Sequence, residues 1–204
     1  MRGKTKCLKG KRFDYIRRLG RLKIYEIIFF GDSPKKIPFI CEIKNEAECE
    51  RFQQGISYKY EEDIEIKIIQ QGLKDNFLKN TQKLLLVDKK VKKVMGEEGM
   101  EDIEYVPVKI EKEEYYIMNI LKIIYGSLNT EKSIVLRYPD DFPNEIVRGE
   151  IGCIWKTVLF QDKIQGHIFR IAEFPSDIFV DEYLKNLIEK NGFTGIDFHA
   201  VELS

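Results

Sequence analysis

The chain has little of what disulfide frameworks and membrane spans are built from. It holds four cysteines, Cys7, Cys41, Cys49 and Cys153, and none of them forms a C-x-x-C pair. We therefore expect reduced, mostly buried thiols. The longest apolar run near the front, residues 27–30, is far too short to span a bilayer. These absences exclude a disulfide-stapled scaffold and give no support to a membrane protein.

Side-chain sets that carry chemistry are also missing. The two histidines are His167 and His199, and Asp197 lies on the same predicted strand face as His199. A metal site needs three or four converging ligands, and no second cluster of suitable spacing is present. Cys153 has no nucleophile signature around it, and residues 192–195 (GFTG) lack the strand–glycine–helix order of a phosphate-binding loop. The sequence predicts no enzyme activity, no metal and no cofactor.

Net charge is absent as well, because 34 Lys and Arg residues balance 34 Asp and Glu residues. The charges are nevertheless unevenly placed. Residues 2–23 hold ten basic residues and one acid, whereas residues 42–65 hold eight acids and three bases. The two segments either solvate a surface and partly neutralise each other, or one of them faces a charged partner. No apolar stretch follows the basic start, so we expect no signal peptide and a cytoplasmic protein.

What is present favours a folded α+β protein. The chain is 43% hydrophobic and contains 13 Phe and 10 Tyr. Asn45, with Glu48 three residues later, resembles a capping box that opens a helix ending at Gly55. Residues 73–80 are predicted to form one or two helical turns. Strands are predicted at 22–30, 63–70, 115–121, 133–138, 151–160 and 167–172.

These elements show no regular βαβ alternation, which favours a mainly antiparallel or mixed sheet with a few packed helices. No convincing linker interrupts the chain, so we expect a single domain over residues 1–204. Tyr115, Tyr116 and Trp155 lie in strand patterns, and we expect all three in the core.

One local pattern occurs twice, at residues 84–110 and, 93 positions later without a gap, at residues 177–203. In the later copy Asp181 is the predicted N-cap of a helix, and Gly192 is predicted to end it. A strand with alternating apolar residues follows. Asp88 and Gly99 occupy the same places in the earlier copy. We interpret both as cap–helix–glycine–strand units, produced either by duplication or by two uses of the same local rules.

The order of these segments resembles a family of bacterial polymorphic-toxin immunity proteins, immunity family eleven. The resemblance covers residues 68–201, so residues 68–204 are the family-like core and residues 1–67 a variable front part. It is carried by "LLLVDKKVKKVM", "IEYVPVKI", "YYIMNIL", "EKSIVL" and the segment from "GHIFRIAEF" to "FHAVEL". Its most specific parts are Val106-Pro107-Val108, Ile168-Phe169-Arg170, Gly192 and Thr194-Gly195-Ile196.

The resemblance implies a cytoplasmic immunity protein that binds and neutralises a cognate toxin domain, encoded next door, by stoichiometric protein–protein contact. It implies no membrane partner and no shared catalytic residues. A nucleic-acid-binding protein that uses basic residues 2–23 is the alternative function. We expect acidic side chains of the front part and of an exposed loop to contact the toxin: Glu42, Glu46, Glu61, Glu62, Asp63, Asp140 and Asp141.

Overall fold

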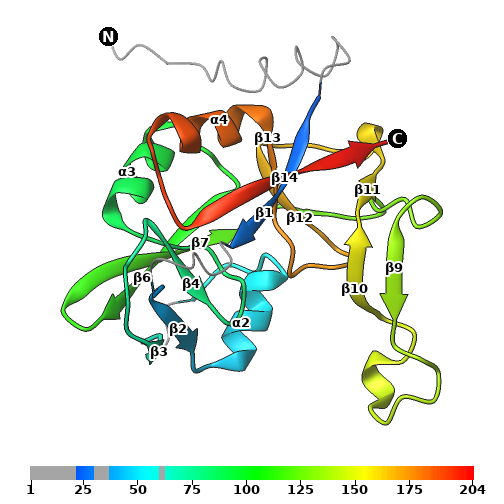
Figure 1. Cartoon of the computed structure of the whole chain (residues 1–204), viewed down its shortest axis with the longest axis horizontal. Coiled ribbons are helices and arrows are strands. Elements are labelled where there is room, and N and C mark those ends of the chain that lie inside the picture. Colours follow the sequence, from blue (N-terminus) through cyan, green and yellow to red (C-terminus); the bar gives the residue numbers. More distant parts are fainter. Residues whose placement is uncertain (1–21, 30–36, 60–62) are drawn as a thin grey trace.

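Among its described residues, the computed structural model contains two six-stranded sheets and a separate two-stranded ribbon (Figure 1). The structure describes residues 22–29, 37–59 and 63–204. Both sheets mix parallel and antiparallel pairs, and helices α2, α3 and α4 accompany them. The predicted α+β class is therefore confirmed. Most of the basic segment 2–23 lies outside the described residues.

The first sheet has the order β3-β2-β4-β5-β7-β6. Strands β2 and β4 run parallel, and the other neighbouring strands are antiparallel. Its longest pairing is the β6–β7 hairpin, which extends from Ile103 opposite Ile120 to Ile110 opposite Glu113. The bounds are β2 Ile40–Ile43, β3 Ile66–Gln70, β4 Phe77–Asn80, β5 Leu86–Val87, β6 Ile103–Ile110 and β7 Glu113–Ile120.

The second sheet has the order β11-β14-β1-β13-β12-β8. Strand β1 lies between β13 and β14, so a strand from the front of the chain occupies the middle of a sheet built from its end (Figure 1). The bounds are β1 Ile24–Phe29, β8 Ile123–Ile124, β11 Val158–Leu159, β12 Ile168–Ile171, β13 Phe179–Asp181 and β14 Ile196–Leu203.

Five strands of one sheet correspond to five strands of the other. The runs β2-β4-β5-β7-β6 and β8-β12-β13-β1-β14 each begin with a parallel pair and continue with three antiparallel pairs. The register agrees as well. Tyr116 pairs with Val87 on one side and Pro107 on the other. Tyr25 pairs with Val180 and Ala200, which lie 93 positions after Val87 and Pro107. The shift that aligns the two sequence segments therefore also aligns their strand pairing.

We call the first sheet with α3 one half of the molecule and the second sheet with α4 the other half. In each half this helix begins after an aspartate and ends before a glycine in the left-handed region. The Asp88 carboxylate accepts from the N–H groups of Lys90 and Val91, and the Asp181 carboxylate accepts from that of Leu184. Gly99 and Gly192 have φ of +60° and +65°. These helices are α3 Lys89–Glu97 and α4 Glu182–Lys190. Side-chain capping satisfies N–H groups that the first turn leaves free.

Both helices also place a lysine over a strand tyrosine, that of β7 in the first sheet and that of β1 in the second. The ammonium of Lys92 lies 3.6 Å from the ring centroid of Tyr116, and that of Lys185 lies 5.2 Å from the ring centroid of Tyr25. A cation over an aromatic face is attracted by the ring quadrupole. The two halves thus share a side-chain contact in addition to their backbone pairing.

The core forms three clusters because alternate strand residues point to opposite faces of each sheet. Val87, Val180 and the inner faces of α3 and α4 belong to a central cluster that both halves share. Leu86, one residue before Val87, belongs to a cluster on the far face of the first sheet, with Phe52 of helix α2 Glu46–Gln53. Phe179, one residue before Val180, belongs to a cluster on the far face of the second sheet.

Two expectations about local structure are wrong. Residues 73–80 form no helical turns; instead they end in strand β4, because Phe77 pairs with Val87 and its N–H donates to the Thr194 carbonyl oxygen. Long-range pairing here overrides the local pattern. Trp155 is 75% exposed and lies outside the core, whereas Tyr115 and Tyr116 are buried as expected.

Candidate protein-binding site

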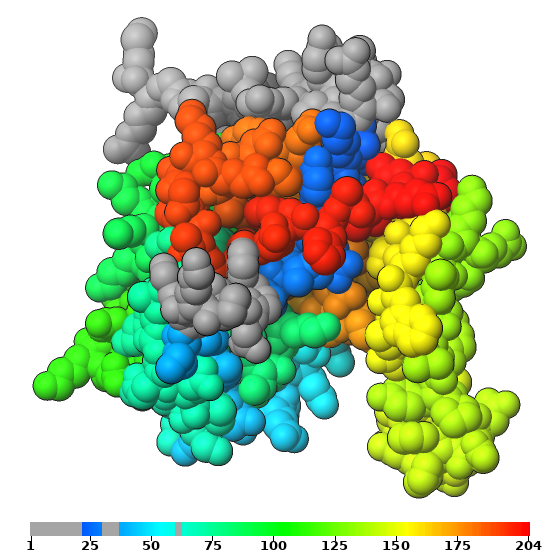
Figure 2. Space-filling view, in the orientation of Figure 1, coloured from blue at the N-terminus to red at the C-terminus, as the bar shows by residue number. Residues whose placement is uncertain are grey.

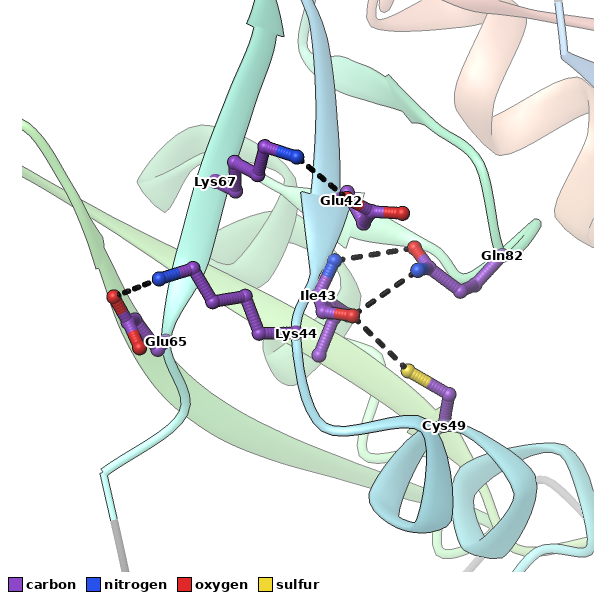
Figure 3. A network of polar contacts seen from close by, with 7 residues as sticks. All are labelled: Glu42, Ile43, Lys44, Cys49, Glu65, Lys67 and Gln82. Carbon is purple, nitrogen blue, oxygen red and sulfur yellow. Dashed lines mark hydrogen bonds and ion pairs between the residues drawn. The ribbon is translucent and has the colours of Figure 1, made fainter.

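The described acids of segment 42–65 gather around β2, α2 and β3, and three of the six have a basic partner. Glu42 pairs with Lys67, whose ammonium lies 3.6 Å from its carboxylate, and Lys44 pairs with Glu65 (Figure 3). Glu48 contacts Arg51 at 3.4 Å within helix α2. Each pair removes one negative charge from the field that a partner would meet. The predicted acidic surface is therefore weaker than its composition indicates.

The backbone of this region is fixed by the amide of Gln82 (Figure 3). Its oxygen accepts from the Ile43 N–H at 3.2 Å, and its nitrogen donates to the Ile43 carbonyl oxygen at 3.1 Å. The nearby thiol of Cys49 points at the same carbonyl oxygen. The Asn45 side chain accepts from the Glu48 N–H, as the predicted helix start requires. The acidic side chains thus stand on a well-ordered turn between β2 and α2.

Of the predicted partner-binding acids in this segment, Glu46 and Asp63 are exposed with no ion pair to any described residue. Glu61 and Glu62 lie outside the described residues. Asp63 borders a pocket of about 180 Å³ beside the start of α2. That volume is below the range of roughly 300–1,000 Å³ usual for cofactor and small-molecule sites. This region is therefore better suited to contact a charged partner surface than to enclose a small ligand.

Asp140 and Asp141 lie elsewhere, in the turn of the β9–β10 ribbon. Strands β9 Ile134–Arg137 and β10 Ile151–Lys156 form the two-stranded sheet, and the ribbon extends away from the two larger sheets as a separate lobe (Figure 1, Figure 2). Both carboxylates are exposed. The predicted acids therefore fall on two parts of the surface, one beside α2 and one at this turn.

Two carboxyl groups near the contact between the two six-stranded sheets have raised pKa values. Burial, with the charge of Asp177 adding to it, raises the pKa of Glu26 to about 7. Burial also raises the pKa of Asp177, and the ammonium of Lys83 lies 3.4 Å from that carboxylate. The Arg170 guanidinium is buried beside them and donates to the carbonyl oxygens of Pro175 and Ser176, at 2.7 and 3.1 Å. These contacts hold a turn in place.

Cys7 lies outside the described residues, Cys41 and Cys49 are buried, and Cys153 is partly buried. His167 Nδ1 lies 2.7 Å from the Asp181 carboxylate that caps α4, and His199 is an exposed residue of β14. Burial raises the pKa of the Cys41 thiol to about 12 and contributes most to raising that of Cys49 to about 11, so both stay protonated. In ranges 22–29, 37–59 and 63–204, no group of three His, Cys, Asp or Glu residues is placed to hold a metal ion.

Comparison with known families decides the assignment. The sequence pattern of the Immunity protein family (Imm11) matches residues 70–202, well over half of the chain. The chain belongs to the Imm11 immunity protein family. A comparison with curated proteins finds no match. The resemblance carried by the repeated units and the motifs between them is thereby confirmed.

The matched region of this Imm11 protein does not form the two sheets alone. It runs from the end of β3 to near the end of β14, yet the second sheet needs β1 between β13 and β14. The first sheet likewise needs β2 between β3 and β4. No described helix of this Imm11 protein has the length and hydropathy of a membrane-spanning helix.

Proposed function

We propose that the protein protects the cell that makes it by binding a cognate toxin domain, encoded beside it, in the cytoplasm. The observation that carries the proposal is its membership of an immunity protein family. The protein acts stoichiometrically and without catalysis, by covering the toxin's active surface.

The acidic side chains contribute by steering the encounter. Glu46 and Asp63 beside α2, and Asp140 and Asp141 at the β9–β10 turn, present negative charge with no ion pair to a described residue. Toxins that act on nucleic acids carry basic clefts, and an acidic surface can occupy such a cleft in place of phosphates. Complementary charge raises the association rate, and added salt lowers this rate again because it screens the attraction.

The test is a calorimetric titration of the purified chain with the toxin domain of the adjacent reading frame. We expect a 1:1 complex, and protection of cells only when the immunity protein is at least equimolar to the toxin. If no complex forms, the proposal fails. If one molecule of the chain inactivates many toxin molecules, the chain is an enzyme and the stoichiometric mechanism is wrong.

A further inference from the structure

The β9–β10 ribbon has one partly buried face and one exposed apolar face. We call residues 133–156 the arm. Val135, Ile151 and Ile154 pack against the core on the outer face of the second sheet. Val135 points inward, so its neighbours Ile134 and Leu136 point outward, and they are 53% and 55% exposed.

Trp155 extends this exposed surface. It lies at an irregularity in the β9–β10 pairing, between Ile154 opposite Val135 and Lys156 opposite Ile134, and is 75% exposed. Large exposed apolar patches on a soluble protein mark binding surfaces more often than chance. Trp is also among the residues that most often dominate the energy of an interface. The arm therefore presents the side chains of a docking surface.

The tip of the arm is ordered by its own contacts. The rings of Tyr138 and Phe142 pack with centroids 4.8 Å apart, and Tyr138 lies over Gly152, where a Cβ would come within 3.1 Å of the ring. Arg148 donates to the Phe142 carbonyl oxygen at 2.7 Å. On this support Ile146 stands 87% exposed. An anchor held ready before binding loses little conformational entropy in the complex.

The base of the arm is fastened to the second sheet. The Ser133 hydroxyl accepts from the Val158 N–H at 3.0 Å, and the Asn129 N–H donates to the Val158 carbonyl oxygen at 2.8 Å. The Asn129 side chain donates to the Ser204 hydroxyl at 3.1 Å, next to the end of β14. An isolated two-stranded ribbon is marginally stable. These contacts let the arm project while keeping its orientation.

The charge of the tip identifies the kind of surface that fits it. Residues 137–150 contain four acids and two arginines. Both arginines are used within the arm: Arg137 donates to the Gly149 carbonyl oxygen, and Arg148 also pairs with Glu145. Asp140 and Asp141 make no ion pair with a described residue. The tip that carries the exposed Ile146 is therefore negative overall.

We propose that the arm is the principal docking element for the cognate toxin, and that the toxin surface it enters is an apolar pocket bordered by basic side chains. This inference rests on the proposed function, and it deepens that function by assigning the partner surface. Trp155 and Ile146 supply the apolar anchors, while Asp140 and Asp141 pair with the basic rim. A second copy of this chain fits less well, because like-charged tips would repel each other.

The experiment measures binding of the full chain to the toxin domain of the adjacent reading frame by surface plasmon resonance. Trp155→Ala and Ile146→Ala should each weaken binding by about 30-fold or more, mainly through faster dissociation. Asp140→Lys with Asp141→Lys should slow association several-fold and flatten its dependence on salt. All four side chains project from the surface, so melting temperatures should stay close to that of the unchanged chain.

Matched controls lie on or beside β3 and α3, which are apart from the arm (Figure 1). Ile69→Ala removes an exposed apolar side chain of β3, and Glu97→Lys with Glu101→Lys reverses two exposed acids near the end of α3. Both controls should bind like the unchanged chain. If the unchanged chain binds the toxin and the arm variants bind equally well, the arm is not the docking element. If the unchanged chain does not bind at all, the proposed function itself fails.

Light scattering on the chain alone distinguishes self-association through the arm from toxin binding. A dimer that Trp155→Ala converts to a monomer, with toxin binding unaltered, would assign the apolar face to a second copy and overturn the proposal. A monomer whose arm variants lose toxin binding supports it.

Discussion

Gly195 joins the two halves of the molecule, and adding one methyl group there should loosen that junction. Its φ is +102°, and a Cβ at this position would lie 2.0 Å from the Phe77 carbonyl oxygen and 2.9 Å from the Asp75 Cβ. The Phe77 N–H donates to the carbonyl oxygen of the preceding residue, Thr194, at 3.0 Å. A side chain at residue 195 must therefore push β4 of the first sheet away from the start of β14.

The expected size follows from three contributions to the free energy of unfolding in Gly195→Ala. Positive φ costs an alanine about 1 kcal/mol. The hydrogen bond at Phe77 is worth about 1 kcal/mol, and displacing a packed backbone costs at least about 1 kcal/mol more. Gly192→Ala is the matched control, because Gly192 has φ +65° but no atom within 4 Å of an added Cβ. Only the first cost, about 1 kcal/mol, applies to it.

Thermal unfolding followed by circular dichroism measures both variants. For a chain of this size 1 kcal/mol shifts Tm by about 2–4 °C, so we expect a drop of about 6–12 °C for Gly195→Ala and about 2–4 °C for Gly192→Ala. Equal drops would show that residue 195 is not pressed against β4. No drop for Gly192→Ala would show that α4 does not end through a left-handed residue.

Two further predictions concern carboxylates that are buried or partly buried. Folding raises the pKa of Glu26 from 4.5 to about 7, so the free energy of unfolding should fall as pH rises from about 4.5 to 7. Glu26→Gln should remove this pH dependence. Because Glu26 is partly exposed, we expect the variant to be only about 1–2 kcal/mol more stable than the unchanged chain in urea titrations at pH 8, with no gain at pH 4. Asp181→Ala should lower the free energy of unfolding by about 2–3 kcal/mol and Asp88→Ala by about 1–2 kcal/mol. Each carboxylate has a further side-chain partner, His167 for Asp181 and Asn76 for Asp88, but Asp181 is buried whereas Asp88 is partly exposed. Equal urea midpoints for the two variants would contradict this.

The sequence was informative where short-range rules decide the structure. A carboxylate at the first turn and a glycine after the last turn were enough to place the ends of α3 and α4. The N–H of Phe193 donates to the Ile188 carbonyl oxygen at 3.3 Å, which is the closing bond expected after Gly192. Such helix ends depend on residues only a few positions apart, so the local sequence is enough to predict them.

Pairing between distant segments was beyond the same reasoning. Nothing local to residues 24–29 indicates that they form the middle of a sheet with residues 179–181 and 196–203. Trp155 shows the same limit for burial, because a strand pattern does not say whether a face meets the core or the solvent. The acids of segment 42–65 were visible, but their pairing with Lys67 and other bases was not. The partner-binding role of these acids stays a prediction.

The central place of β1 in the second sheet has a consequence for synthesis. Tyr25 pairs with Val180 and Ala200, so the strand leaves the ribosome far ahead of both its neighbours. At roughly 5–20 residues per second, the gap lasts on the order of 10–30 s. Throughout that time both edges of the segment "IYEIIF" are unpaired. Its β-branched and aromatic composition is typical of segments that aggregate. The first strand among the described residues is therefore among the last to find its pairing partners.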